Sequence, residues 1–441
     1  MISIHRIEKV ITVLSILAYC IVYFWVYTSF VVPVYGKSED YSIPIISFWN
    51  TILTLFFIFV PVPALSILVK KVSQVIVWII YIIIYVPLLF MPYFNCMDLI
   101  SLIFANCSLM IGFLMIIYFS KGKKISVLKK NLSYSEIRPY LYFFSSVILF
   151  ITLYHNKSEL RLANPLDSGE VYSQRLNKNV DNSGVYGYFF NWIASVFTPI
   201  FVISGLFFKI RQDVIYGIVI CILVYMIGAN KLFILTLITS FIVFWMVKKS
   251  ANFFGSKILW FLTFLMILTT LLFKYFEESE FKLVIQSLAM MVTIRTVGIS
   301  TYNYKYYYDF FITQNNPKTY LSHISIVDFF TDTYPYKYSL GQVIGDVYFG
   351  TTDYQLNANF FISDGLCAFG IFGFIIAGIA CGYMLRILDS ASQNHKLELS
   401  VGLTFYASMN FANVSLFTAF VTGGLVFVIL YLYALSPTKC L

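Results

Sequence analysis

Long runs of apolar residues, separated by short polar segments, dominate the chain. A transmembrane helix needs about 20 mostly apolar residues, because each residue adds about 1.5 Å along the helix axis. Runs that meet or approach this length cover residues 10–32, 44–69, 73–91, 98–119, 137–154, 186–208, 214–228, 232–247, 258–275, 359–388, 397–413 and 418–435. They predict an all-α polytopic membrane protein with about 12 transmembrane helices. Residues 1–441 are expected to form a single integral membrane domain.

Two long polar segments interrupt this pattern. The first large loop is expected over residues 155–185 and the second over residues 276–356. Counting the spans places both loops on the same side of the membrane. Within the second loop, residues 281–297 carry apolar positions at helical spacing, which predicts a short interfacial or re-entrant helix. Loops of this length are uncommon between packed helices and tend to carry function.

Composition supports membrane residence. The chain is 59% hydrophobic and 12% charged, whereas a soluble domain contains about 25% charged residues. Too little polar surface is available to keep such a chain in water. The first apolar run is too long for the core of a signal peptide, so it is expected to remain as a helix.

The net charge of +9 arises from short basic clusters between apolar runs, such as Lys70–Lys71, Lys129–Lys130 and Lys248–Lys249. Cationic loops of this kind are retained on the cytoplasmic side of a membrane. An orientation with both termini in the cytoplasm places most of the 30 Lys and Arg residues there. Both large loops then face the periplasm. The clusters form no continuous basic stripe, so a nucleic-acid partner is not expected.

The sequence lacks the common motifs of soluble enzymes. It contains no P-loop, H-E-x-x-H, G-x-S-x-G or D-x-D pattern, and its seven cysteines include no C-x-x-C pair. The sequence therefore does not support nucleotide hydrolysis, zinc catalysis or the nucleophile elbow of an α/β-hydrolase. We expect no metal or cofactor. A lipid-linked donor suits such a chain, because its diphosphate leaving group is already activated.

Four cations near the predicted outer boundary are candidates for binding that diphosphate: Arg161, Arg175, Lys231 and Arg295. A guanidinium matches the geometry of a phosphate, and a charge close to hydrocarbon needs a partner. Arg295 follows the apolar stretch 290–294. The alternative for the two loop arginines is pairing with the neighbouring carboxylates Glu159, Asp167 and Glu170.

Glycosyl transfer also needs a group that orients or deprotonates the acceptor hydroxyl. Loop carboxylates of this kind are Glu159, Asp167, Glu170, Asp328, Asp346 and Asp364, with His323 and His155 as further candidates. Each has a plainer interpretation as a solvated, capping or structural residue. A tyrosine cluster at positions 302, 304 and 306–308 is expected either to stack on sugars or to belong to an interfacial aromatic belt.

Two segments resemble a known family. The first contains T-I-R-T-V-G at 293–298, Y-Y-D-F-F at 307–311 and N-P-K-T-Y-L-S at 316–322. The second contains N-A-N-F at 357–360, followed by Asp364-Gly365, Gly370 and Gly373. Both are similar to the periplasmic motifs of the oligosaccharide repeat-unit polymerases, the Wzy or O-antigen polymerase family.

The resemblance implies a C-type glycosyltransferase-like fold in the bacterial inner membrane. It implies transfer of a growing glycan from undecaprenyl diphosphate to the non-reducing end of an incoming lipid-linked repeat unit, at the periplasmic face. A flippase (Wzx) and a chain-length regulator (Wzz) would be the protein partners. The expected catalytic residues are Arg295, His323, Asp346 and Asp364, and the expected substrate-binding residues are Arg161, Arg175, Lys231, Glu170, Tyr307, Asn357 and Asn359.

Two other functions remain open at this point. An O-antigen ligase would use the same lipid-diphosphate donor but a different acceptor. A flippase or another transporter for lipid-linked oligosaccharides would also suit the helix count. Against a transporter stand the two long loops on one side and the shortage of charged residues deep within the apolar runs.

Overall fold

The computed structural model describes residues 2–39, 41, 43–44, 47–123, 125, 131–157, 160–164, 168–176, 185–276, 281–296 and 299–438. Regular structure in these ranges is helical, apart from two isolated β-bridges, Leu68–Asn252 and Leu132–Leu435. The prediction of an all-α protein is confirmed for this part of the chain.

Eight helices of the described ranges are long and apolar enough to cross a membrane. Three of these spans run through a π-helical turn without breaking. The spans comprise α1 (Ile2–Val26) with η1 (Tyr27–Val31) and α2 (Val32–Glu39), α4 (Val72–Ile80) with η3 (Tyr81–Tyr85) and α5 (Val86–Phe94), α6 (Leu99–Ser120), α7 (Tyr134–His155), α9 (Val185–Trp192) with η5 (Ile193–Phe197) and α10 (Thr198–Phe207), α11 (Arg211–Gly228), α13 (Phe254–Tyr275) and α20 (Gly373–Ser392). The chain is therefore a polytopic, membrane-embedded protein.

The other four predicted runs also form helices. Residues 44–69 give α3 (Phe48–Phe59) and the short η2 (Val62–Ala64), and residues 232–247 lie in α12 (Lys231–Lys249). The last two runs give α21 (Leu397–Met409) with η9 (Asn410–Ala412), and α22 (Leu416–Val421) with α23 (Leu425–Ala434). Most of these are shorter than one membrane thickness requires at about 1.5 Å per residue.

One predicted span is interrupted. The apolar run 359–388 was expected as one continuous helix, but the helix from Gly373 to Ser392 is preceded by the π-helical η8 (Phe361–Leu366) and the short α19 (Cys367–Phe369). Gly370 has a φ of +70° between them, a conformation that glycine adopts without steric cost. Hydropathy cannot detect this break because the residues stay apolar across it.

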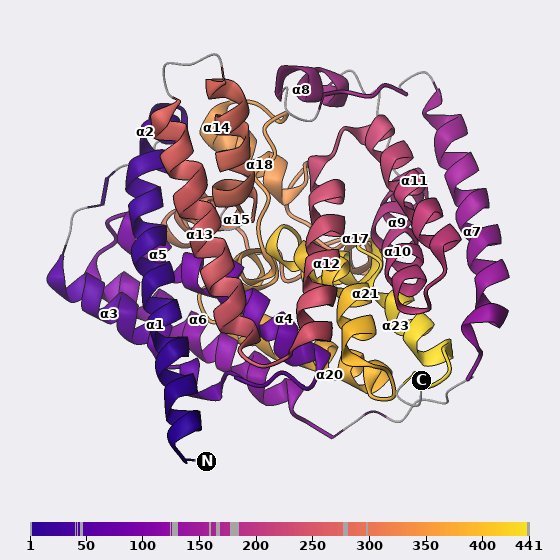
Figure 1. The fold of residues 1–441 in the computed structure, drawn as a ribbon. Coiled ribbons are helices and arrows are strands. Elements are labelled where there is room, and N and C mark those ends of the chain that lie inside the picture. Colours follow the sequence, from indigo (N-terminus) through magenta and orange to yellow (C-terminus); the bar gives the residue numbers. More distant parts are fainter. Residues whose placement is uncertain are drawn as a thin grey trace.

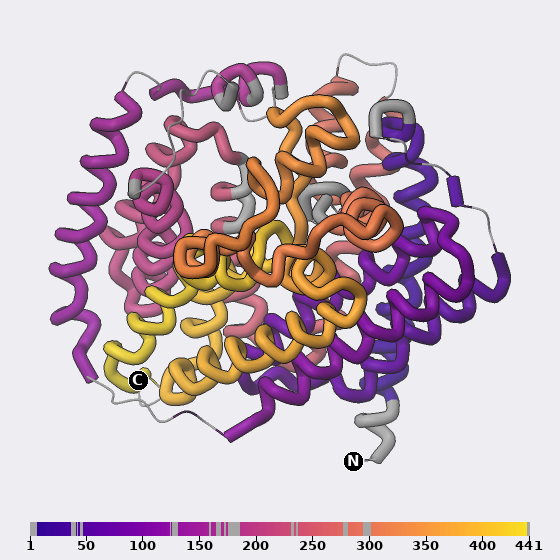
Figure 2. The backbone as a smooth tube through the Cα atoms, turned by 180° about the vertical axis from the view of Figure 1, so that it is seen from behind, coloured from indigo at the N-terminus to yellow at the C-terminus, as the bar shows by residue number. Residues whose placement is uncertain are grey.

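The long helices stand side by side around a core of shorter and tilted elements (Figure 1). The helices α1 and α13 pack together, as do α10 with α11 and α12 with α21. Figure 2 shows the same bundle from behind, with the chain termini at the lower end in both views. The helix α8 (Ser168–Leu176) and the helix α14 (Lys282–Met290) lie at the opposite end (Figure 1). The two predicted large loops thus contribute to the same end of the molecule.

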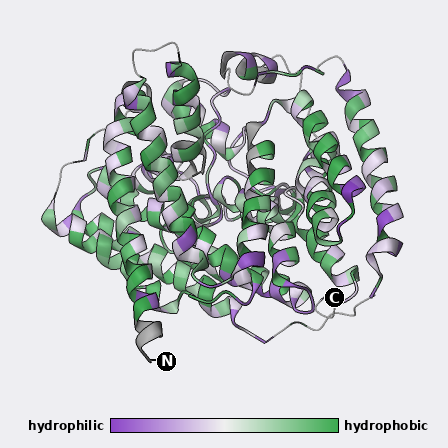
Figure 3. Cartoon of the chain, in the orientation of Figure 1, coloured by the Kyte–Doolittle hydropathy of each residue, from purple (hydrophilic) through white to green (hydrophobic). Residues whose placement is uncertain are grey.

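Apolar residues cover the outer surfaces of the long helices (Figure 3). Examples are Leu14 in α1, Phe150 in α7 and Phe264 in α13, which expose between 52% and 70% of their surface. Side chains of this kind on the outside of a bundle suit lipid as the solvent. A helix satisfies most of its own backbone polar groups, as a bilayer requires.

The second large loop is mostly folded. It contains α14, continued by η6 (Met291–Thr296), and then α15 (Ile299–Tyr302), α16 (Tyr304–Tyr308), η7 (Asp309–Thr313), α17 (Ser325–Thr331) and α18 (Leu340–Phe349). The helix expected over residues 281–297 is present as α14 and η6. Its placement in or on the membrane stays a prediction.

Candidate functional site

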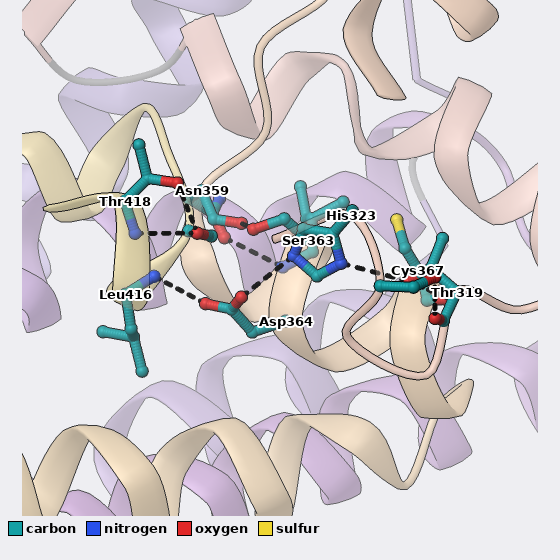
Figure 4. Close-up of polar contacts among 11 residues, drawn as sticks. Thr319, His323, Asn359, Ser363, Asp364, Cys367, Leu416 and Thr418 are labelled. Carbon is teal, nitrogen blue, oxygen red and sulfur yellow. Dashed lines mark hydrogen bonds and ion pairs between the residues drawn. The ribbon is translucent and has the colours of Figure 1, made fainter. Parts of the chain in front are cut away.

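A histidine and an aspartate from separate segments meet inside the bundle. The Nε2 atom of His323 lies 3.1 Å from Oδ1 of Asp364. Their side chains are only 7% and 4% exposed. A buried ionisable pair in a membrane protein is costly unless its hydrogen bonds are satisfied, and such pairs are functional-site candidates by default. Figure 4 shows the two side chains and their neighbours.

Asp364 is held by the interrupted span. It lies in η8, and its Oδ2 accepts a hydrogen bond of 2.6 Å from the backbone nitrogen of Leu416 at the start of α22. The carboxylate therefore also satisfies an N–H group at a helix N-terminus, where negative charge is favourable. The turn behind it is tight, because a Cβ on Gly373 would lie 2.0 Å from the carbonyl oxygen of Gly365.

His323 is held by the segment that precedes α17. Its Nδ1 lies 3.1 Å from the hydroxyl of Thr319, and the backbone nitrogen of Thr319 donates to the carbonyl of Cys367 at 3.0 Å. The hydroxyl of Tyr336 donates to the carbonyl of Pro317, and burial raises the pKa of Tyr336 to about 12. The phenol therefore stays protonated and keeps its role as a donor at neutral pH.

The histidine can hold either of two protonation states in this arrangement. In the neutral ring, Nε2–H donates to Asp364 and Nδ1 accepts the hydroxyl proton of Thr319. In the imidazolium, Nδ1–H donates to the same hydroxyl, which can then donate to the carbonyl of Cys367, 3.4 Å away. The hydrogen-bond partners around the ring thus fit both forms of the histidine.

Asn359 lies five residues before Asp364, just ahead of the π-helical η8. Its side-chain oxygen accepts from the backbone nitrogen of Ile362 at 3.2 Å, and its carbonyl accepts from Ser363. The side chain is fully buried, and its Nδ2 has no hydrogen-bond partner among the described residues. An unsatisfied buried donor is uncommon in native structures and calls for an explanation, such as a ligand or a water.

The first large loop contains an ion pair at the end of the molecule where α8 lies. Arg161 contacts Glu170 through Nη2 and Oε1 at 2.9 Å, and Glu170 also accepts from the backbone nitrogen of Asn164. The Arg161 side chain is 60% exposed, so the pair contributes little to stability. Pairing with a neighbouring carboxylate is the alternative to phosphate binding that the sequence offered for Arg161. Phosphate binding by Arg161 stays a prediction.

Three other predicted residues are placed without contact to the His323–Asp364 pair. Asp346 is exposed on α18, and Asn357 is exposed with its carbonyl accepting from Asn303. The ring of Tyr307 is buried, and its hydroxyl donates to the carbonyl of Leu356 at 2.6 Å. A sugar could reach this ring only if the surrounding segments moved. The described parts of the structure therefore bring His323 and Asp364 into contact, with Asn359 five residues before Asp364, and leave these residues apart.

The backbones of Arg175, Lys231 and Arg295 are described, in α8, at the start of α12 and in η6 respectively. Their side chains lie outside the described part of the structure, as do Glu159 and Asp167 altogether. Their assignments as phosphate-binding or base residues stay predictions. No group of three or more His, Cys, Asp or Glu residues that could hold a metal ion occurs among the described residues.

Sequence reasoning missed a buried carboxylate on α11. Asp213 is fully buried and accepts from the hydroxyls of Tyr134 and Tyr142, each at 2.7 Å, and from Nε of Arg138 at 2.9 Å. All three donors lie on α7. The signal that could have revealed it is Arg138 inside a predicted apolar run, which needs a partner.

Comparison with known proteins identifies no relatives. No family model, no curated protein and no solved structure matches the chain. Function is therefore inferred below from the residues and their geometry.

Proposed function

We propose that this chain is a membrane glycosyltransferase that polymerises lipid-linked oligosaccharide repeat units. It would transfer the growing glycan from undecaprenyl diphosphate to the non-reducing end of an incoming unit at the periplasmic face of a bacterial inner membrane. The observation that carries the proposal is the buried His323–Asp364 pair: Asp364 belongs to the second segment that resembles repeat-unit polymerases, and His323 directly follows the first. It supplies a base and an orienting carboxylate without a metal or nucleotide site.

The transfer step assigns a role to each member of this group. The acceptor hydroxyl attacks the anomeric carbon of the donor, and the bond from that carbon to the lipid diphosphate breaks. His323 accepts the hydroxyl proton, and Asp364 stabilises the imidazolium through the Nε2 contact. The unsatisfied amide of Asn359 is the proposed hydrogen-bond donor to a bound saccharide. Arg295, Arg161, Arg175 and Lys231 are the proposed partners of the diphosphates.

Access to the histidine requires movement. The hydroxyl of Thr319 occupies the position at Nδ1 that the acceptor hydroxyl would take. Thr319 belongs to a loop segment between η7 and α17 rather than to a spanning helix. His323 belongs to the same segment, so Nδ1 becomes accessible only if the Thr319 side chain turns away while Asp364 continues to hold Nε2. Small rearrangements of this kind commonly complete an active site when substrate binds.

Replacement of His323 by alanine tests the proposal. Loss of a general base typically slows a reaction by about 10²–10⁴-fold, so His323→Ala should leave single repeat units at the cell surface in place of long chains. The measurement is the length distribution of surface polysaccharide, with the amount of membrane-inserted protein determined in parallel. His155→Ala is the matched control, because His155 stacks on Tyr186 at the surface and touches neither proposed partner.

Two results would contradict the proposal. Full-length polysaccharide from a well-expressed His323→Ala variant would show that His323 is not the base of the transfer reaction. Complete loss of surface saccharide, with lipid-linked polymer retained in the membrane, would indicate a ligase in place of a polymerase.

A transporter of lipid-linked oligosaccharides is the second candidate, favoured by two specific observations. The span around residues 361–392 is discontinuous, and an ionisable pair is buried at the break. Transporters often bind substrate and protons at discontinuous helices. Lipid-linked repeat units trapped on the cytoplasmic leaflet of a His323→Ala strain would favour this function, whereas units that reach the periplasmic leaflet would exclude it.

A further inference from the structure

A cavity of about 240 Å³ lies away from the His323–Asp364 pair, at the end of the molecule that carries the chain termini. The start of α4, the end of α20 and the start of α21 surround it. A single water needs only about 10–15 Å³ on a comparable measure. The cavity is therefore large enough for a polyatomic ligand.

Cations dominate its lining. Lys70, Lys71 and Arg386 contribute three positive charges, against the single carboxylate of Asp389. That carboxylate accepts from the backbone nitrogen and the hydroxyl of Ser73 at 2.9 and 2.6 Å. Across the part of the chain that the structure describes, none of the three cations forms an ion pair. The lining therefore carries a net positive charge that a bound anion would neutralise.

Arg386 is held in position by one hydrogen bond. Its Nε donates to the carbonyl of Lys123, and the terminal nitrogens of the guanidinium have no protein partner among the described residues. A guanidinium fixed in this way retains the paired donors that bind a phosphate in a bidentate manner.

The N-terminus of the helix α21 also lines the cavity. Leu397 and Ser400, in the first turn of α21, form part of the wall. The unsatisfied N–H groups and the dipole at a helix N-terminus favour an anion. Among the described residues, three cations without an ion-pair partner and the N-terminus of α21 thus line the same cavity, and both favour a bound anion.

We infer that this cavity binds a phosphate group. Basic pockets between transmembrane helices near a cytoplasmic surface are suited to the headgroups of anionic lipids, and the same chemistry would bind free phosphate from solution. Such a site is separate from the proposed transfer reaction and would hold even if that reaction were different.

Binding can be measured on the purified full-length chain in a neutral detergent. The midpoint of thermal unfolding is followed while dihexanoyl phosphatidylglycerol or inorganic phosphate is added, with chloride at equal ionic strength as the reference. A ligand that binds only the folded state raises this midpoint in a saturable manner. The test variant is Lys70→Gln with Lys71→Gln. The control is Lys248→Gln with Lys249→Gln, which removes the same charge from a basic cluster outside the cavity.

We expect half-saturation in the test variant to require at least roughly tenfold more ligand, and the control to match the wild type. A response to the lipid alone would assign the site to a lipid headgroup, and an equal response to inorganic phosphate would assign it to phosphate from solution. The inference is overturned if neither ligand gives a saturable rise, or if both double variants lose the response equally.

Discussion

The carboxylate of Asp213 illustrates how one buried residue can join two spanning helices. It lies at the start of α11 and receives three hydrogen bonds from α7, two from tyrosines and one from Arg138. Hydrogen bonds to a charged group contribute more than neutral ones. The helix α7 also contacts the bundle through the hydroxyls of Ser145 and Ser146, which lie near that of Tyr216, and through apolar packing, but most of its residues are not buried. We therefore expect the position of α7 to depend on this residue.

Asp213→Asn keeps the volume of the side chain but removes its charge and one acceptor oxygen. We expect the free energy of unfolding to fall by about 2–3 kcal/mol, since a buried acceptor loses the charge that strengthens its three hydrogen bonds and the half-buried Arg138 loses its counter-charge. The measurement is the midpoint of thermal unfolding in detergent. Asp346→Asn, on the exposed face of α18, should change stability by less than about 0.5 kcal/mol. Equal midpoints for the two variants would show that the network is not stabilising.

At the scale of elements, the crossing of α6 and α20 depends on glycine. A Cβ on Gly378 would lie 2.0 Å from the carbonyl oxygen of Gly112, and a Cβ on Gly112 would lie 2.3 Å from the carbonyl oxygen of Phe374. Backbones can approach this closely only where both side chains are absent. Since α20 continues from the segment that carries Asp364, this contact also supports the candidate site.

Gly378→Ala should force the two helices apart. A methyl group directed at a backbone carbonyl cannot be relieved by a rotamer change, so a loss of about 3 kcal/mol or more is expected. Reduced yield of monodisperse protein and a lower unfolding midpoint would report it. Ile376→Ala is the control on the exposed face of the same helix. Wild-type behaviour of Gly378→Ala would mean that the helices do not cross at this point.

Hydropathy predicts the long helices well and the interrupted ones poorly. The run 98–119 became α6 (Leu99–Ser120), and the run 137–154 became α7 (Tyr134–His155). Periodicity and apolar length suffice where a helix is regular. The break at Gly370 escapes both signals, because apolar residues continue through it and only the glycine spacing hints at a turn.

The candidate site was predictable as separate residues but not as a pair. His323 and Asp364 each stood out as a polar residue near an apolar run, yet 41 residues separate them. Their contact depends on how the segment before α17 folds onto η8, which no local pattern reports. The sequence also suggested Asp346 and Tyr307, which lie on an exposed helix face and in the core.

At the scale of the whole molecule, the arrangement of the ends agrees with an even number of crossings. The termini lie at one end of the bundle, and α8 and α14 lie at the other (Figure 1). The end with the termini also carries Lys70, Lys71 and Arg386 around the inferred phosphate cavity. Because cationic segments are retained in the cytoplasm, this end is expected to be cytoplasmic and α8 periplasmic.

Reporter fusions test that orientation. Green fluorescent protein fused to the C-terminus should fluoresce, because it folds in the cytoplasm, and alkaline phosphatase at the same position should be inactive. Phosphatase inserted after Lys157, an exposed residue just after α7, should be active because it reaches the periplasm. An exposed loop position of this kind tolerates added residues. Phosphatase activity at both positions would require an even number of crossings between them and would contradict this orientation. The reversed pattern would place the His323–Asp364 pair in a chain of opposite orientation and exclude a periplasmic polymerase.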